Sequence, residues 1–376
     1  MNFSKLDTYL HQLPECGIPG CELAVSYKGE LVYRGFAGYA DAQKTRPVSE
    51  NDLYYVFSIS KITTCVSAMR LVEEGKLGLD DPVSKYLPAF AYLTVKGADG
   101  KPYPAQNVMT VRHLFTMTGG LNYDLKAAPI LRAKQDPNAN TLSLVSSMAE
   151  MVLGFEPGTR YCYSLCHDVL AAVVEVVSGM RFADYVQKNV FDPLKMADTG
   201  YHLPEEKRAR MADMYTFTHR LMVATPIELR NSYILNDRYD SGGAGLYSSA
   251  NDQIKLLTVL ANGGTTKDGY SLLRPETIQM MTVNQLPDSA MPQFAPTNLY
   301  GFGWGLCGRA HMNPTISRSR SGVGEFGWDG AAGAYGLIDP QKQVAIYYGM
   351  HVLSCQFGSH MIHPTLRNLA YEAIED

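Results

Sequence analysis

A serine and a lysine three residues apart, Ser58 and Lys61, stand at the start of an apolar-periodic segment that runs to about Glu74. In a helix, residues i and i+3 share a face, so this spacing brings the amine near the hydroxyl. A serine attacks a carbonyl only after a base takes its proton, and a lysine can be that base where burial or a neighbour lowers its pKa. The free N–H groups of a first helical turn also let the amide of Ser58 donate to a developing oxyanion. The pair predicts a serine nucleophile with a lysine base.

The tetrapeptide alone also fits a second interpretation, a serine that caps a helix and a lysine that points into solvent. Further blocks of sequence favour the catalytic interpretation, and they occupy residues 110–120, 156–164, 190–196, 242–246 and 300–305. In this order, and together with the Ser58 motif, they resemble the superfamily of serine β-lactamases, penicillin-binding proteins and carboxylesterases. The resemblance covers nearly the whole chain. It implies a β-lactamase/transpeptidase-like fold and an acyl-enzyme formed on Ser58.

The second element of this superfamily is Tyr-x-Asn, and the matching stretch here is Tyr163-Ser164-Leu165. The resemblance implies that the phenol of Tyr163 relays a proton between Ser58, Lys61 and the leaving group. Leu165 stands where the superfamily has the asparagine, and we expect it to contact the substrate. Without the flanking blocks, a tyrosine packed in the core would be the ordinary interpretation, because the chain has 24 tyrosines.

The third element is a strand with Lys-Thr-Gly or His-x-Gly, and the matching stretch runs over residues 327–333. Trp328 replaces the cation that helps bind the substrate carboxylate in β-lactamases, which favours an uncharged, apolar substrate. We expect Gly330 to let the substrate lie along the strand edge, and the N–H of Ala331 matches the second oxyanion donor. Asp329 has two interpretations, contact with a cationic substrate or a solvated carboxylate at the end of a strand.

The absence of the asparagine and of the cation weakens the case for β-lactams and D-alanyl peptides, because an ester carries neither of the groups that they bind. The pattern is similar to the carboxylesterase branch of the superfamily, known as family VIII, and implies a small-molecule ester or amide as substrate. Two alternatives stay open. One is a β-lactamase or D-alanyl-D-alanine peptidase, and the other is a non-catalytic, penicillin-binding-like sensor that keeps the pocket without turnover.

Sheet signals at both ends of the chain and helical signals between them must position these groups. Alternating apolar residues predict two strands within residues 21–39, joined at 28–30, and two more at 335–338 and 344–350. Between them the periodicity is mostly helical, as in 62–74 and 165–177, and a glycine follows each segment. A short amphipathic helix is expected near residues 6–13 and a final one from about Pro364.

We therefore predict an α+β fold, with an antiparallel sheet built from both chain termini, flanking helices and a large, mostly helical inserted lobe. The sheet region is expected to comprise residues 1–75 and 286–376, and the helical region residues 76–285. The active site should lie at their interface.

The composition narrows the class of protein. A chain of 376 residues with 46% hydrophobic and 19% charged residues can bury a large core. A net charge of −4 and scattered basic residues argue against nucleic acid as a partner. The longest apolar stretch is too short for a bilayer, and the polar start lacks the features of a secretory signal, so we expect a cytoplasmic protein without a membrane partner.

Cofactors are not expected either. Two Gly-x-Gly-x-x-Gly strings, at 303–308 and 322–327, do not open a helix as a dinucleotide site requires. The histidines and cysteines lack the spacing of a zinc site, and the odd count of seven cysteines predicts reduced thiols. The oligomeric state is left open by the sequence.

Overall fold

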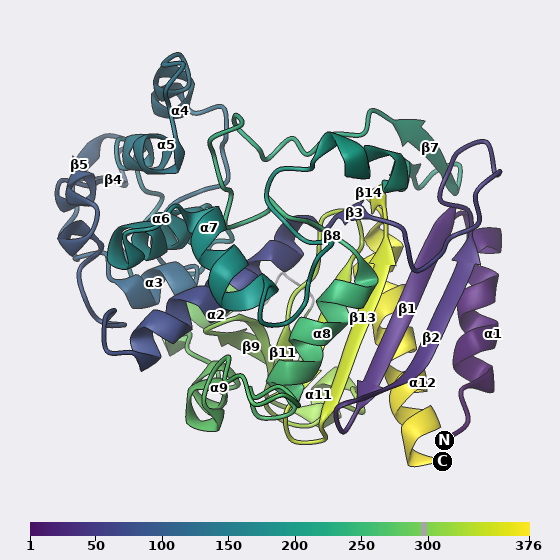
Figure 1. Cartoon of the computed structure of the whole chain (residues 1–376). Helices are drawn as coiled ribbons and strands as arrows, with labels where there is room; N and C mark the ends of the chain where they lie inside the picture. Colours follow the sequence, from purple (N-terminus) through teal and green to yellow (C-terminus); the bar gives the residue numbers. More distant parts are fainter. Residues whose placement is uncertain (295–298) are drawn as a thin grey trace.

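The structure, a computed structural model, describes residues 1–294 and 299–376. Its largest sheet has seven strands in the order β2-β1-β13-β12-β11-β10-β9, all antiparallel to their neighbours. The strands are β1 (Gly20–Tyr27), β2 (Glu30–Gly38), β9 (Phe302–Gly305), β10 (Gly308–His311), β11 (Phe326–Gly327), β12 (Tyr335–Asp339) and β13 (Val344–Met350). The predicted sheet from both ends of the chain is confirmed (Figure 1).

The hairpin between β1 and β2 turns at Lys28 and Gly29, which both have positive φ, 52° and 81°. Two consecutive residues at positive φ are typical of the tight hairpin turns that match the twist of the strands. This agrees with the join predicted at residues 28–30.

Helices cover both faces of the sheet, and the strand residues therefore alternate between two cores. Leu23 and Tyr348 face the helices at the chain ends, α1 (Ser4–Gln12) and α12 (His363–Glu375). Ala24, Ala345 and Tyr347 face the opposite, larger core. The two terminal helices lie side by side on one side of the sheet, and Asn2 N–H donates to the carbonyl of Ala373 (Figure 1).

Helix α8 (Ala250–Ala261) covers the other face of the sheet, against β1, β12 and β13 (Figure 1). It comes from the stretch that we assigned to the helical region, so part of residues 76–285 packs on the sheet. The limits of the two regions remain a prediction.

The helical part of the chain is centred on the contact between α2 (Ser60–Glu73) and α6 (Cys166–Ser178). Both helices match the predicted segments, and the left-handed Gly179 (φ 68°) ends α6 as expected. The remaining α-helices are α3 (Val111–Phe115), α4 (Ala128–Ala133), α5 (Thr141–Met148), α7 (Phe182–Val186), α9 (Pro275–Met281), α10 (Met291–Phe294) and α11 (Pro314–Ser317).

Short elements complete the fold. The minor strands are β3 (Tyr54–Tyr55), β4 (Thr94–Lys96), β5 (Pro102–Pro104), β6 (Met214–Thr218), β7 (Val223–Ile227), β8 (Tyr247–Ser248) and β14 (Val352–Leu353). The 3₁₀ or π turns are η1 (Leu13–Cys16), η2 (Phe57–Ile59), η3 (Val83–Lys85), η4 (Pro88–Ala91), η5 (Gln187–Phe191), η6 (Glu205–Arg210), η7 (Asp288–Ala290) and η9 (Gly358–Ile362).

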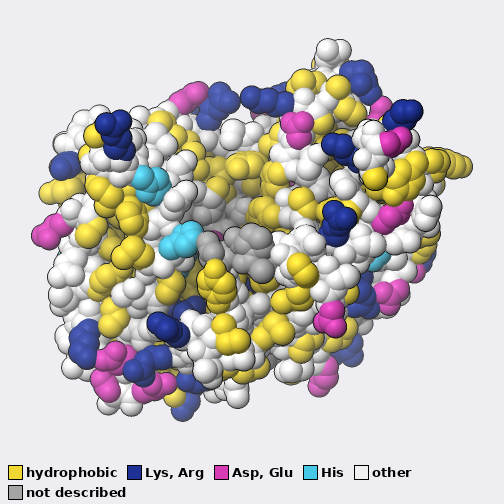
Figure 2. All heavy atoms as spheres, turned by 180° about the vertical axis from the view of Figure 1, so that it is seen from behind, with side chains coloured by type: hydrophobic (Ala, Val, Ile, Leu, Met, Phe, Trp, Pro, Cys, Tyr) yellow, Lys and Arg dark blue, Asp and Glu magenta, His cyan; other side chains and the backbone are white. Residues whose placement is uncertain are grey.

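Charges do not gather into one patch on the face that Figure 2 shows. Lys and Arg side chains there are interspersed with Asp and Glu around the periphery, and hydrophobic side chains border a central hollow (Figure 2). In residues 1–294 and 299–376, no helix has both the length and the apolar character needed to cross a membrane.

Candidate active site

Ser58 lies in a tight turn between strand β3 and helix α2. The turn is the 3₁₀ helix η2, so Ser58 precedes α2, whereas we expected it within the first turn of the helix. Phe57 has φ 47°, a left-handed conformation that an aromatic residue rarely adopts and that surrounding structure must enforce. The Ser60 hydroxyl helps to enforce it, donating to Phe57 O at 2.6 Å and accepting from Leu246 N–H at 3.0 Å.

Lys61 is fully buried, and its side-chain nitrogen contacts Ser58. Its Nζ lies 3.2 Å from Ser58 Oγ, as the spacing predicted. It also donates to the carbonyl of Gly243 at 2.7 Å and to the phenol oxygen of Tyr123 at 3.2 Å. All three partners are neutral groups, and they fix the direction in which the amine points.

Tyr163 brings the third predicted group to the same place. Its hydroxyl donates to Ser58 Oγ at 2.8 Å, and its ring centroid is 4.7 Å from Lys61 Nζ. Tyr163 stands three residues before α6, so the packing of α6 on α2 positions its ring. A hydroxyl, an amine and a phenol from two distant segments therefore meet.

Tyr123 is a site residue that the sequence reasoning missed. Its ring stacks on that of Tyr163, with centroids 5.6 Å apart and planes at 20°. Burial, helped by the nearby Asp168 carboxylate, raises the pKa of Tyr123 well above its ordinary value, so its phenol stays protonated at neutral pH. The available signal was its place three residues after the block at 110–120.

Trp328 also contacts Tyr163. Its indole N–H donates to the Tyr163 hydroxyl oxygen at 2.9 Å, and its ring packs on Trp304, with centroids 4.5 Å apart. We expected Trp328 to favour an uncharged substrate, because it has no charge to bind a substrate carboxylate. The structure adds that it is a neutral hydrogen-bond donor to the phenol that contacts Ser58 Oγ.

Asp329 differs from both of our interpretations. Its carboxylate binds Arg309 of β10 at 2.8 Å and lies 3.6 Å from the His363 ring nitrogen of α12. Burial acts to raise the pKa of Asp329, but Arg309 and His363 together lower it below its ordinary value. The carboxylate is therefore paired within the protein although 24% of the side chain is exposed, and this pairing attaches the loop that carries Trp328 to β10 and α12.

Gly330 and Ala331 continue this loop. A side chain at Gly330 would collide with the carbonyl oxygen of Val56, so the glycine allows the loop to approach the backbone just before the nucleophile. We had expected the glycine to make room for the substrate along the strand edge, whereas in the structure it makes room for the Val56 carbonyl. Ala331 is exposed. Within the described parts of the chain, no acceptor lies on the backbone N–H of Ser58 or Ala331.

Leu165 does not line the site. Its side chain is 1% exposed and belongs to the larger core, because the start of α6 turns it inward. The prediction that Leu165 contacts the substrate is therefore wrong for this conformation.

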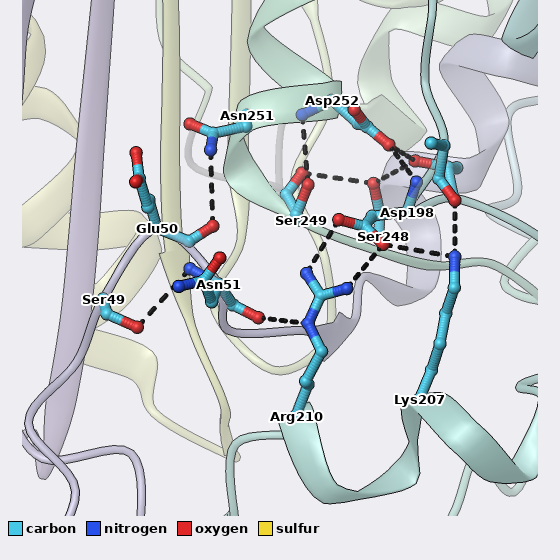
Figure 3. Close-up of polar contacts among 12 residues, drawn as sticks. Ser49, Glu50, Asn51, Asp198, Lys207, Arg210, Ser248, Ser249, Asn251 and Asp252 are labelled. Carbon is cyan, nitrogen blue, oxygen red and sulfur yellow. Dashed lines mark hydrogen bonds and ion pairs between the residues drawn. The ribbon is translucent and has the colours of Figure 1, made fainter.

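A polar network holds the segment that leads into β3 (Figure 3). Arg210 donates twice to the Asp198 carboxylate, at 2.7 Å each, and once to the carbonyl of Asn51 at 2.8 Å. Asn251, at the start of α8, donates to the carbonyl of Glu50 at 3.3 Å. These bonds hold the chain near Asn51, seven residues before Ser58, next to α8. The residues that make these bonds have no regular spacing in the sequence, so the network could not be predicted from it.

No group of three or more His, Cys, Asp or Glu that could hold a metal occurs in residues 1–294 and 299–376.

The chain matches the family described as Beta-lactamase over residues 6–358. Esterase EstB of Burkholderia gladioli is 30% identical over 363 residues, which cover 89% of this chain and 87% of that protein.

Two solved structures share the fold. EstCE1, described as a hydrolase with promiscuous acyltransferase activity, has a TM-score of 0.81 and 25% identity, covering 100% of this chain and 98% of its own. A family VIII carboxylesterase has a TM-score of 0.73 at 20% identity, covering 99% and 97%. The chain therefore belongs to the Beta-lactamase family, has the β-lactamase/transpeptidase-like fold, and is a serine hydrolase with esterase relatives.

Proposed function

We propose that the protein is a carboxylesterase that cleaves small, uncharged esters through an acyl-enzyme on Ser58. The observation that carries this proposal is the pair of contacts on Ser58 Oγ, 3.2 Å from Lys61 Nζ and 2.8 Å from Tyr163 OH. A serine that touches two groups able to move its proton fulfils the geometric requirement for a nucleophile with a base.

In the proposed reaction, Ser58 Oγ attacks the ester carbonyl, and its proton passes to the Lys61 and Tyr163 pair. The N–H groups of Ser58 and Ala331 then donate to the oxyanion, which the absence of competing acceptors supports. The carbon–oxygen bond to the alcohol breaks, and the alcohol leaves with a proton from Tyr163. Water adds to the acyl-enzyme by the reverse relay and releases the acid.

The surroundings of the site favour an uncharged substrate. Trp328 takes the position of the cation that binds a carboxylate in β-lactamases, and the charge of Asp329 is compensated by Arg309. The partly exposed rings of Tyr123, Tyr163 and Trp328 form an apolar wall beside Ser58. The relation to esterase EstB supports an ester over a β-lactam or D-alanyl peptide.

The test compares nitrophenyl acetate, butyrate and octanoate with nitrocefin and a D-Ala-D-Ala peptide. We expect the esters to be cleaved fastest and Ser58→Ala to lose at least a thousandfold in kcat/KM. Ser289→Ala, at an exposed serine, is the matched control and should keep wild-type rates. Equal ester rates in Ser58→Ala would reject the proposed nucleophile.

Two other outcomes identify the alternatives. Faster turnover of nitrocefin or the peptide would point to a β-lactamase or peptidase. Labelling of Ser58 by a fluorophosphonate without turnover of any substrate would point to a sensor. Addition of an alcohol would reveal acyl transfer, the activity named for EstCE1, as an ester product formed at the expense of the free acid.

A further inference from the structure

A cavity of about 700 Å³ lies between the start of β9, the α11 turn and helix α12. We call it the α12 cavity, and its lining includes Phe302, Ile316, Ser317, Arg318 and Arg367. It contains none of the residues that surround Ser58.

Arg367 is a buried cation in this cavity, with only 6% of its surface exposed. In the described parts of the chain it has no carboxylate within ion-pair distance. Its Nε donates to the amide oxygen of Asn368 at 3.3 Å, and its guanidinium lies 5.9 Å from the centroid of the Phe302 ring. A guanidinium with so little exposed surface is only partly hydrated, so an anion in the cavity would compensate its charge.

Arg309 is another buried arginine of this chain, and its charge is compensated. Arg309 is 2% exposed and binds two carboxylates, Glu325 at 3.2 Å and Asp329 at 2.8 Å. The second oxygen of Glu325 accepts from Ser321. Asp339 is likewise occupied, since it accepts from the hydroxyl of Tyr371 at 2.6 Å. Both acids therefore already have partners within the protein.

The α11 turn is preorganised at the rim of the cavity. Asn313 caps it by accepting from Ile316 N–H at 3.1 Å, and Ser317 Oγ lies 2.7 Å from a ring nitrogen of the buried His311. Arg318 follows in the left-handed conformation, φ 54°, and its carbonyl accepts from Asn368 at 3.1 Å. The backbone at Arg318 is therefore held by the capped α11 turn on one side and by Asn368 of α12 on the other.

We propose that the α12 cavity binds a small organic anion. Its carboxylate or phosphate group would contact Arg367, with Arg318 at the rim, because both guanidinium forks match the geometry of such oxyanions. Its apolar part would pack on Phe302 and Ile316. This site is independent of the proposed esterase chemistry, so either assignment can fail without the other.

The test measures the thermal unfolding midpoint and titration calorimetry with sodium phosphate and with sodium benzoate, with sodium chloride at equal ionic strength as the reference. We expect an increase in midpoint on the order of 2–4 °C at 10 mM of the preferred anion. The two salts separate a phosphate site from a carboxylate site. Equal shifts with chloride, or no shift with either anion, would overturn the proposal.

Three variants locate the effect. Arg367→Gln should abolish the shift, and without anion it should unfold no earlier than the wild type, since it removes an uncompensated charge. Arg320→Gln, an exposed arginine that is paired with Glu375, is the matched control and should keep the full shift. Arg318→Gln should weaken binding about tenfold, the loss expected for one charged contact. This exposed variant decides the case if Arg367→Gln does not fold, and unchanged binding in it would then refute the site.

Discussion

Replacing Asp329 by asparagine tests whether this residue anchors the loop or contacts the substrate. The change keeps the shape of the side chain and removes the charge that faces Arg309 at 2.8 Å and His363 at 3.6 Å. A hydrogen bond to a charged group contributes about 1.5–3 kcal/mol, and Arg309 keeps Glu325 as a partner. We therefore expect Asp329→Asn to lower the free energy of unfolding by about 2 kcal/mol at pH 7.

The difference between the two proteins should depend on pH. Because the pKa of Asp329 is lowered in the folded state, its contribution is present above the unfolded value of about 4. It is lost as the pH falls through the folded value, so the two unfolding free energies should converge below about pH 4.

Urea unfolding followed by tryptophan fluorescence measures this well, because the two tryptophans of the chain, Trp304 and Trp328, both lie at the site. The kcat for a neutral ester should fall about tenfold as the loop shifts, which corresponds to about 1.4 kcal/mol. Asp288→Asn, at an exposed aspartate, is the control. Unchanged stability together with loss of activity on cationic esters alone would refute the anchoring role and support contact with the substrate.

Three further predictions concern neighbouring groups. Trp328→Phe should lower kcat for nitrophenyl acetate about fivefold with little change in KM, because Tyr163 loses a donor worth about 1 kcal/mol. Steady-state kinetics check this, and an unchanged kcat would contradict it. Tyr123→Phe should slow the labelling of Ser58 by a fluorophosphonate several-fold, because it removes one of the three oxygen atoms that the buried Lys61 amine contacts. Labelling at the wild-type rate would show that the other two contacts are enough to orient the amine. Burial lowers the pKa of His167 to about 3 and of His351 to about 4, so both are held neutral when folded. Their contribution is complete above about pH 6.5 and falls as the pH drops toward 4, so the unfolding midpoint should decrease over that window, less so in His351→Gln.

The sequence predicted those parts of the site that depend on local spacing or on a recognisable block. Ser58 and Lys61 meet because a helical period of three to four residues places them together, and the 3₁₀ turn preserves that spacing. Tyr163 followed from its block, since spacing alone does not relate residue 163 to residue 58. The strands at both ends were predictable because alternation and a tight turn are local signals.

Residues that reach the site from distant segments were not predictable in the same way. Tyr123 has no periodic relation to Lys61, and Arg309 lies 20 positions before the carboxylate that it binds. The sequence shows that residue 329 is an aspartate, but it does not show that Arg309 is the cation that pairs with it. Leu165 was misplaced for a related reason, because a family position predicts where a backbone lies and not which way an apolar replacement turns.

The direction of the hydrogen bonds at Ser58 bears on the proposed role of this serine as the nucleophile. Trp328 donates to Tyr163, Tyr163 donates to Ser58 Oγ, and Lys61 Nζ approaches the same oxygen. Two donors that converge on one hydroxyl oxygen stabilise the negative charge that forms when its proton leaves. For Lys61 or Tyr163 also to take that proton, one of these bonds must reverse. The group that donates to the Tyr163 oxygen is the neutral indole of Trp328 and not a cation. The phenol can therefore change from donor to acceptor toward Ser58 Oγ without displacing a bound ion.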